Sequence, residues 1–385
     1  MIEQIQATGY KCLQLESPLI AKALNVLVGS NASGKSSLLQ TLLLLRQSAD
    51  ESGTVRELHL SGALYEAGTA MDALHPSANH KILMHLVSDG VSYDFSFQFD
   101  RDDAKAKRRL MKAEAAVELR GALVEKGESF CYLNAERIGP RVAYPLPPDE
   151  FDIAGLVGKN GEYTAGRLAQ SASGFAISGW SEDLCKKWSD VVKQLDGFEI
   201  QKDLADTGGR LDLVTNLFLS WIIPGAVFEA TEVESIDSAP LRFVRDPLST
   251  RVGTRATHVG FGLTYTLPIL AGAFSLASNG LLIVENPEAH LHPFSQSRMG
   301  VFLALIAATG RQVFVETHSD HVVNGIRLAL RYKLIGHEQV VFNHFHNLVD
   351  EARSEVKQIA PDSEGALEDW PPGFFDQIEK DLSRL

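Results

Sequence analysis

The residues best suited to chemistry are the run G-S-N-A-S-G-K-S over positions 29–36. It fits the phosphate-binding pattern G-x-x-x-x-G-K-[ST], in which backbone N–H groups at the start of a helix surround anionic oxygens. We predict that Lys35 binds the β- and γ-phosphates of a nucleotide and that the Ser36 hydroxyl ligates Mg²⁺. The predicted phosphate contacts are Gly29, Ser30, Asn31, Ala32, Ser33, Gly34, Lys35, Ser36 and Ser37.

The neighbours of this loop supply the elements that must position it. The run Asn25–Val28 predicts a short buried strand, and the leucine-rich run 37–47 predicts a helix. A strand, a glycine-rich loop and a helix in this order are the context in which the pattern carries weight. The alternative, a chance glycine–serine turn after a strand, is disfavoured by that context.

Carboxylates and a histidine follow two further buried strands. The aliphatic run Leu281–Val284 ends in Glu285. The run Gln312–Val315 leads into Glu316 and His318. Ligands of open α/β sheets bind at the carboxyl ends of the strands. Together with the phosphate loop, these residues predict a nucleotide-hydrolysis site.

A second glycine-containing turn precedes a long apolar helix. The turn His258–Leu263 contains Gly260 and Gly262, and the segment Thr264–Ala277 is predicted to be helical. A glycine-rich turn that opens a helix can bind an anion. Such turns are common, so this one indicates little by itself.

Composition limits the class of protein. The length of 385 residues and the hydrophobic share of 45% suit one large α/β domain with an insertion, or two domains. The formal net charge is −13, so any nucleic-acid contact must be a local basic patch. Three scattered cysteines predict reduced thiols in a cytoplasmic protein. We find no signal-peptide pattern, and the longest apolar run, 263–277, falls short of a membrane span.

The order of patterns predicts three regions. Residues 1–144 form the first half of a nucleotide-binding domain, with a β-rich lobe in which Val91–Phe99 alternates as an antiparallel strand does. Residues 145–250 are predicted to be a mainly helical insertion. Residues 251–385 complete the domain and include a hairpin over 340–359.

Basic residues gather at one place in this acidic chain. The usual meaning of such a run is a solvated hairpin tip, and contact with nucleic acid is the less favoured alternative. For Arg137 and Arg141, phosphate or partner contacts and surface ion pairs are about equally favoured. The basic cluster is Lys105, Lys107, Arg108, Arg109 and Lys112.

Together these motifs resemble those of ABC-class ATPase heads of the RecF/SMC/OLD type, and more closely a RecF-like branch of the AAA-family ATPases. The resemblance covers nearly the whole chain. It implies an α/β P-loop ATPase head with a mixed sheet, an antiparallel N-terminal β lobe and a helical insertion. It rests on the phosphate loop, the Gly-Phe-Gly turn at 260–262, the V-E-N-P-E-A-H-L-H-P run at 284–293, the E-T-H-S-D-H run at 316–321 and the W-P-P-G-F-F-D-Q tail at 370–377.

The resemblance also implies roles for single residues. Glu285 stands where such heads have the Mg²⁺-linked acid, and His318 matches the switch histidine that senses the γ-phosphate. The signature turn, Gly260, Phe261 and Gly262, would contact ATP held by the other subunit of a homodimer, and the loop 289–292 would cross the dimer interface. The implied cofactors are ATP and Mg²⁺, with Ser36 and Glu285 as metal ligands. Gln47 is a weak candidate for a switch glutamine, and a structural role at the helix end is favoured.

The sequence departs from the family pattern at two places. Asn286 occupies the usual position of the catalytic glutamate, and an amide cannot accept a proton from water as a carboxylate can. Either Glu288 or Glu316 takes that role, or turnover is slow. Glu288 is favoured because it lies on the same strand-end loop. The signature turn lacks its usual serine, which leaves backbone N–H groups and Thr264 to contact the phosphate.

Four histidines suggest a competing interpretation. His290, His292, His318 and His321 could ligate a hydrolytic metal ion, since histidine and carboxylate clusters often do. Their spacing matches no zinc pattern, and the phosphate loop already accounts for the site. The metal centre is therefore the less favoured interpretation.

We predict an Mg²⁺-dependent ATPase that dimerises around ATP and regulates a separate effector, such as a nuclease. The sequence has no room for an appended nuclease domain or long coiled-coil arms, which suggests a stand-alone subunit. By analogy, the setting is bacterial defence against phage or DNA repair. The alternative is an ATP-gated clamp or scaffold with little hydrolysis, which Asn286 favours. A third, weaker alternative is a nuclease in its own right.

Overall fold

The computed structural model describes residues 1–99, 109–149, 152–171, 182–196, 207–244, 253–348, 352–367 and 377–384. The chain divides into two units. The first unit comprises residues 1–125, 338–362 and 366–385, and the second comprises 126–337 and 363–365. The phosphate loop therefore belongs to the first unit, whereas both acid-bearing strands belong to the second.

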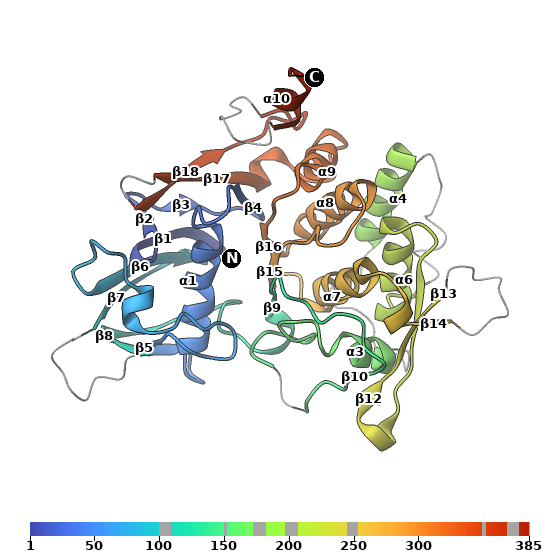
Figure 1. The fold of residues 1–385 in the computed structure, drawn as a ribbon, viewed down its shortest axis with the longest axis horizontal. Helices are drawn as coiled ribbons and strands as arrows, with labels where there is room; N and C mark the ends of the chain where they lie inside the picture. Colours follow the sequence, from blue (N-terminus) through green and yellow to red (C-terminus); the bar gives the residue numbers. More distant parts are fainter. Residues whose placement is uncertain are drawn as a thin grey trace. The chain divides into compact units, whose positions relative to one another are not determined.

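An antiparallel lobe forms much of the first unit (Figure 1). In this lobe β1 pairs with β6, β6 with β7, β7 with β8, and β8 with β5. Along β7, the side chains of Tyr93, Phe95 and Phe97 are buried and their neighbours are more exposed, as the alternation predicts. The bounds are β1 Ile2–Tyr10, β5 Thr54–His59, β6 Lys81–Ser88, β7 Val91–Gln98 and β8 Leu110–Glu118.

The remaining strands of the first unit include the one that leads into the phosphate loop. Strand β4 (Leu24–Gly29) lies parallel to β17 (Val340–Leu348), which pairs antiparallel with β18 (Arg353–Ile359). Strand β18 lies parallel to β2 (Leu13–Gln14), and β1 pairs with both β2 and β3 (Leu19–Ile20). The predicted C-terminal hairpin is confirmed, and the sheet is mixed, as predicted.

Helix α1 (Lys35–Ser48) follows the phosphate loop and is buried on almost every side. Its leucines at 38, 39 and 42–45 are at most 2% exposed, which is typical of a helix that is apolar all round. At its far end, Arg46 Nη1 donates to the carbonyl oxygens of Leu123 at 2.6 Å and Glu125 at 3.0 Å. Packing along the whole helix thus holds its first turn in place. The first unit also contains the short helices α2 (Ala70–Ala73) and α10 (Gln377–Leu382).

A parallel three-strand arrangement lies at the centre of the second unit. Strand β15 (Leu281–Glu285) pairs with β9 (Phe130–Leu133) on one side and β16 (Gln312–Glu316) on the other. The aliphatic residues of β15 and all of β16 are buried, as expected for strands covered on both faces. Glu285 stands opposite Glu316 in the register. The two predicted acid-bearing strands are therefore confirmed as neighbours.

Helices pack around these strands through an aromatic cluster. The ring of Phe218 lies 4.0 Å from Trp188, 4.9 Å from Phe274 and 5.5 Å from Phe302, measured between centroids. These four residues join α4, α6, α7 and α8 in one core. The helices are α3 Thr164–Ser171, α4 Glu182–Asp196, α6 Leu211–Ile222, α7 Phe261–Ser275, α8 Pro293–Ala308 and α9 Asp320–Arg331.

Residues 145–250, which the sequence predicts to be a mainly helical insertion, lie entirely within the second unit. Their described part contains α3, α4 and α6 but also short strands that the sequence pattern does not predict. Strands of two to four residues leave too little alternation to recognise. The boundaries of the three predicted regions stay predictions. The strands are β10 Tyr144–Pro145, which pairs with β12 Ser238–Ala239, and β11 Val227–Ala230 and β13 Leu241–Val244. The last two form one small sheet with β14 Thr254–Arg255, which lies just beyond the region.

Helices α8 and α9 approach each other closely at two glycines. A Cβ atom on Gly325 would overlap the carbonyl oxygen of Ser297, and one on Gly300 would overlap that of Val322. Both overlaps are with backbone atoms, which cannot rotate away. The two glycines thus fix how closely the helix that starts after β16 can pack.

We expect Gly325→Ala to destabilise the second unit by about 2 to 3 kcal/mol, because overpacking against a backbone forces the helices apart. Urea unfolding followed by tryptophan fluorescence measures the change. The exposed neighbour Asn324 provides a control, since Asn324→Ala should stay within about 0.5 kcal/mol of the parent. A Gly325→Ala protein as stable as the parent would contradict the close packing.

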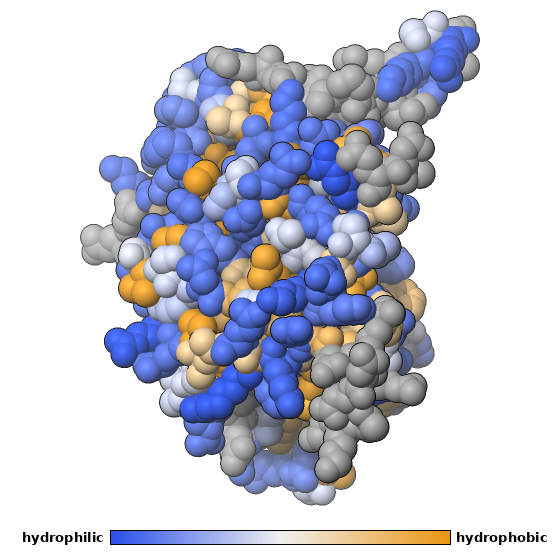
Figure 2. All heavy atoms as spheres, turned by 90° about the vertical axis from the view of Figure 1, so that its left-hand side faces the viewer, coloured by the Kyte–Doolittle hydropathy of each residue, from blue (hydrophilic) through white to orange (hydrophobic). Residues whose placement is uncertain are grey.

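The described surface gives few signs of a broad apolar face. Figure 2 shows one face on which hydrophilic residues dominate and apolar ones are scattered. Among the described residues, no helix is both long and apolar enough to span a bilayer. Of the basic cluster predicted around residues 105–112, only Arg109 and Lys112 lie within the described residues. The tail motif lies outside them except for Gln377, the first residue of α10.

Candidate functional site

The backbone of the phosphate loop has the shape that its glycines predict. Gly29, Ala32 and Gly34 have φ angles of 138°, 59° and 99°, so three residues of the loop lie in the left-handed region. A Cβ atom on Gly34 would lie 2.5 Å from the Ser354 hydroxyl oxygen. Backbone that alternates in this way turns successive N–H groups toward one concave side, which is an anion-binding arrangement.

The Lys35 side chain folds back into the loop. It is 3% exposed, and its ammonium group donates to the carbonyl oxygens of Gly29 at 3.0 Å and Ser30 at 2.7 Å. The Ser33 hydroxyl donates to the same Ser30 oxygen at 2.8 Å. The loop is thus closed around a buried positive charge. An ammonium group and inward N–H groups in one loop fit phosphate oxygens, which supports the predicted role of Lys35.

Other positive groups surround this loop. His344 on β17 is buried, and its pKa is lowered first by burial and then by the charges of His346, Lys357 and Lys35. The same repulsion that disfavours a charged imidazole favours an anion. The electrostatics of the first unit therefore agree with phosphate binding.

The lowered pKa of His344 predicts an acid-sensitive first unit. Because the folded pKa lies below the ordinary value of 6.5, the unfolded chain takes up the proton first as the pH falls. Stability is therefore full above about pH 6.5 and is lost below it. Urea midpoints at pH 7.5 and 5.5 should differ less for His344→Gln than for the parent. The exposed His258 gives a control, since His258→Gln should leave the difference unchanged.

The serines that follow Lys35 begin helix α1. Ser36 is half-buried, and its hydroxyl is the hard oxygen donor that Mg²⁺ prefers. Ser37 is buried, with its hydroxyl 3.8 Å from the Cys12 sulfur. Gln47 lies near the end of the helix. Its amide nitrogen donates to the carbonyl oxygens of His59 and Tyr65, and its amide oxygen accepts from the Tyr65 N–H. This agrees with the structural role that the sequence favours for Gln47.

In the second unit, Glu285 ends β15 as a half-buried carboxylate. Its Oε1 accepts a hydrogen bond from the Tyr132 hydroxyl at 3.0 Å. Burial raises the pKa of Glu285, and hydrogen bonds from Tyr132 and the Ala135 backbone, together with the charge of Arg137, partly oppose the shift. A bound cation would favour the ionised form. The oxygen donor and its environment therefore fit the predicted Mg²⁺ ligand.

The turn after β15 has an unusual backbone. Asn286 has a φ of 46°, and its N–H donates to the Glu316 carbonyl at 2.8 Å. Asparagine tolerates this left-handed conformation better than most residues do. The side-chain oxygen Oδ1 of Asn286 is buried and has no hydrogen-bond partner among the described residues. The turn thus holds a fixed acceptor at the position where the resemblance implies a catalytic glutamate.

Arg137 holds this turn through hydrogen bonds to its backbone carbonyl groups. It is 2% exposed and donates to the carbonyl oxygens of Asn134 at 3.1 Å, Glu285 at 2.7 Å and Asn286 at 2.6 Å. Its guanidinium carbon lies 5.2 Å from the ring centroid of Tyr265 on α7. Burial lowers the pKa of Arg137 to about 10, although the charges of Glu288, Tyr265 and Glu285 oppose the shift. The burial of Arg137 contradicts the predicted surface ion pair, whereas the predicted phosphate or partner contact stays a prediction.

The other two predicted catalytic residues also meet in the second unit. Glu288 accepts hydrogen bonds from the Thr317 hydroxyl at 2.8 Å and from the His318 backbone N–H at 2.7 Å. His318 is exposed, whereas Glu316 is buried within β16. The structure thus brings Glu288 and His318 together through the backbone. The contacts with Thr317 left no recognisable sign in the sequence.

The signature turn forms the start of α7. Gly260 precedes the helix, and Phe261 is exposed, with its ring centroid 5.2 Å from that of His290. A Cβ atom on Gly262 would lie 2.6 Å from the His290 carbonyl oxygen, so the turn approaches the loop 289–292 closely. The Thr264 hydroxyl donates to the Phe261 carbonyl at 3.1 Å. A hollow of about 500 Å³ adjoins this turn and is lined by Gly260, Gly262, His290, His292 and residues of β13 and α8.

The histidines do not form the alternative metal centre. Nowhere in the described part of the chain do three or more His, Cys, Asp or Glu side chains gather in a way that could hold a metal ion. His290 packs on Phe261 and Tyr265, and His292 Nδ1 accepts from the Phe294 N–H at 3.3 Å. His290 and His292 thus have structural partners on α7 and α8.

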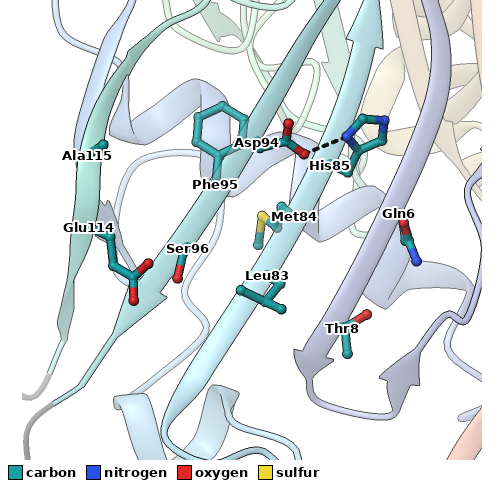
Figure 3. Close-up of a pocket in the computed structure, with 10 residues that line it drawn as sticks. All are labelled: Gln6, Thr8, Leu83, Met84, His85, Asp94, Phe95, Ser96, Glu114 and Ala115. Carbon is teal, nitrogen blue, oxygen red and sulfur yellow. Dashed lines mark hydrogen bonds and ion pairs between the residues drawn. The ribbon is translucent and has the colours of Figure 1, made fainter.

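A separate hollow of about 450 Å³ lies on the antiparallel lobe, and it contains none of the predicted site residues. Figure 3 shows that strands β1, β6, β7 and β8 contribute its side chains, and that His85 pairs with Asp94. Their Nδ1 and Oδ1 atoms lie 2.7 Å apart, and Asp94 is 80% exposed. An exposed pair of this kind contributes about 0 to 1 kcal/mol. We interpret it as a surface feature.

The fold and the phosphate loop, together with the family and structural matches, support an ABC-class ATPase head of the RecF/SMC type. The chain belongs to the family described as "AAA domain, putative AbiEii toxin, Type IV TA system", whose model matches residues 24–129 and 178–324. A second family model, described as a protein of unknown function (DUF3696), matches residues 335–385.

Solved structures match the chain at low sequence identity. An Smc head domain bound to the C-terminal domain of ScpA, derived from Pyrococcus furiosus, has a TM-score of 0.50 and 12% identity, over 100% of this chain and 98% of that one. An SMC head domain from Thermotoga maritima and the recombination mediator RecF each have a TM-score of 0.41 and 12% identity, over 92% of this chain and 98% of theirs. No curated protein matches the chain.

Proposed function

We propose that this protein is an Mg²⁺-dependent ATPase whose nucleotide state controls a partner. The observation that carries the proposal is the phosphate loop. Its left-handed residues and the buried Lys35 ammonium converge within a single loop between β4 and α1. Such a loop has little structural use for a buried cation other than to bind an anion.

Each predicted site residue has a role in this proposal. Lys35 and the N–H groups of residues 29–37 bind the phosphates, and the start of α1 adds partial positive charge. Ser36 and Glu285 supply oxygen ligands for Mg²⁺, which fits their chemistry. When bound, Mg²⁺ neutralises charge on the phosphoryl oxygens. The exposed imidazole of His318 senses the γ-phosphate.

ATP would also join two copies of the chain. The signature turn supports this idea, because the backbone at Gly260 is open and Phe261 is half-exposed at the start of α7. In a homodimer, this turn would contact ATP that is bound by the phosphate loop of the partner. The aromatic contacts with His290 hold the turn in a fixed shape beforehand.

The partner that responds to ATP is a separate effector, for which a nuclease is our first candidate. The family description refers to a putative toxin of a toxin–antitoxin system, which favours a role in bacterial defence over DNA repair. The matched Smc head binds ScpA, which is a precedent for a head that works through a second protein. We place the protein in the cytoplasm, and the basic cluster around Lys112 is the candidate DNA contact.

Nucleotide titration and a phosphate-release assay test this proposal directly. We expect ATP to bind in the presence of Mg²⁺ and more weakly in EDTA, and phosphate release to depend on both. Light scattering should show a larger mass with ATP than with ADP. If the purified protein neither binds ATP at millimolar concentration in the presence of Mg²⁺ nor releases phosphate, the proposal is wrong. Adding DNA to the assay tests whether nucleic acid is the trigger.

One observation favours a second function, that of an ATP-gated clamp with little hydrolysis. Position 286 holds an amide, which cannot take a proton from the attacking water. A clamp would bind ATP and dimerise yet release almost no phosphate over hours. Steady turnover above the rate of a Lys35→Ala control would instead support the ATPase.

A further inference from the structure

One carboxylate joins the turn after β15 to the turn after β16. Glu288, on the first turn, accepts from the Thr317 hydroxyl through Oε2 and from the His318 N–H through Oε1, at 2.8 Å and 2.7 Å. The backbone adds a third link, because the Asn286 N–H donates to the Glu316 carbonyl at 2.8 Å. Since β15 and β16 are paired in register, these bonds lock two neighbouring strand ends together.

The hydrogen bonds continue from Thr317 into helix α9. The Thr317 hydroxyl oxygen accepts from the Ser319 N–H at 3.1 Å. The Ser319 hydroxyl in turn accepts from the Val322 N–H at 3.1 Å and donates to Gln296 on α8 at 2.6 Å. Ser319 is thus the N-cap of α9. Glu288 stands at one end of a network that fixes the whole turn 316–319.

This geometry favours a positioning role for Glu288 over that of a general base. A base must direct an oxygen toward the water that it deprotonates. Each oxygen of Glu288 instead accepts a hydrogen bond from the turn 316–319, and Thr317 is fully buried, so the carboxylate is oriented toward that turn. The exposed group that this turn presents is His318.

We propose that Glu288 is a positioning residue, which holds the turn 316–319 so that His318 is presented to the nucleotide, and is not the group that accepts the proton of water. The proposal rests on the ATPase function proposed above. It explains why a glutamate follows Asn286 by two residues without restoring the missing base. It also makes slow turnover the expected behaviour of the protein.

Kinetics of three variants test this role. In Glu288→Gln the amide oxygen can still accept from the His318 N–H, and the Thr317 hydroxyl can rotate to accept from the amide nitrogen. We therefore expect kcat to fall less than about tenfold, and the decline of kcat at acidic pH to be unchanged. Glu288→Ala removes both acceptors and should lower kcat by about 10- to 100-fold, with KM for ATP nearly unchanged. Adding Thr317→Val to Glu288→Ala should lower kcat by clearly less than the product of the two single effects, because the two substitutions remove one shared hydrogen bond. The exposed Glu229 provides the control Glu229→Gln.

The opposite results would identify a general base. A loss above about 1,000-fold in Glu288→Gln, together with loss of the acidic limb, would overturn the proposal. So would additive effects of the Glu288 and Thr317 substitutions, since residues that act through one hydrogen bond are not additive.

Hydrogen exchange in the nucleotide-free protein gives a readout that does not depend on turnover. The His318 amide should exchange at least about tenfold faster in Glu288→Ala than in the parent or in Glu229→Gln, because its acceptor is lost. Unchanged exchange would overturn the proposal even in an active ATPase. If the parent neither binds nor hydrolyses ATP, the proposed function fails, and the exchange experiment still decides whether Glu288 holds the turn.

Discussion

Replacing Lys35 by alanine should abolish measurable ATP binding. Lys35 has the only charged side chain among residues 29–37, all of which are described. Its side chain is already buried before a nucleotide binds. On binding, it exchanges the carbonyl oxygens of Gly29 and Ser30 for phosphate oxygens. Charge-assisted hydrogen bonds contribute about 1.5 to 3 kcal/mol each, so losing two of them weakens binding by roughly 100-fold or more.

Titration of a fluorescent ATP analogue with Mg²⁺ measures this loss. Lys35→Met is the matched variant, because it fills the space of the buried stem without the charge and should fail in the same way. Lys112→Ala, at an exposed position on β8, should bind like the parent. Retained affinity in both Lys35 variants would show that the nucleotide does not lie on this loop.

Replacing Arg137 by alanine should destabilise the second unit by about 3 to 4 kcal/mol. The substitution leaves the carbonyl oxygens of Asn134, Glu285 and Asn286 without their donor, and it opens a cavity next to Tyr265. Each buried acceptor left without a partner costs about 1 to 3 kcal/mol, and the turn can recover part of that loss by relaxing. The same change should distort the backbone that carries Glu285 and Asn286.

Urea unfolding monitored by tryptophan fluorescence measures the effect, since Trp188 and Trp221 lie in this unit. Arg137→Lys should recover less than half of the loss, because a single ammonium group cannot imitate the planar fork of donors. Arg141→Ala is the control, as Arg141 is exposed and only four residues away. A loss below about 1 kcal/mol for Arg137→Ala would show that the turn does not depend on this side chain.

Local patterns were sufficient to predict the main elements of the fold. The alternation of β7, the aliphatic runs of β15 and β16, and the leucines of α1 each report burial within a few consecutive residues. The strands between 227 and 255 were not predictable in this way, because they are short and their pairing joins segments 10 or more residues apart.

The candidate site was predictable where a motif is contiguous and unpredictable where it is not. The phosphate loop lies in one run, so its left-handed residues and its lysine follow from the pattern. Arg137 bonds to carbonyl groups 148 and 149 residues away, and Glu288 bonds to Thr317, 29 residues away. Backbone acceptors are the same in every residue type, so the sequence cannot reveal which of them a buried arginine will find.

The left-handed backbone at Asn286 limits how this ATPase could become faster. A glutamate in this left-handed conformation would destabilise the fold by roughly 1 to 2 kcal/mol through steric strain. It would also add a negative charge directly after Glu285. A single codon change is therefore a poor route to rapid turnover. Acceleration would require the turn itself to be rebuilt. If the proposed function holds, the lifetime of the ATP-bound form would depend on the main chain as much as on any side chain.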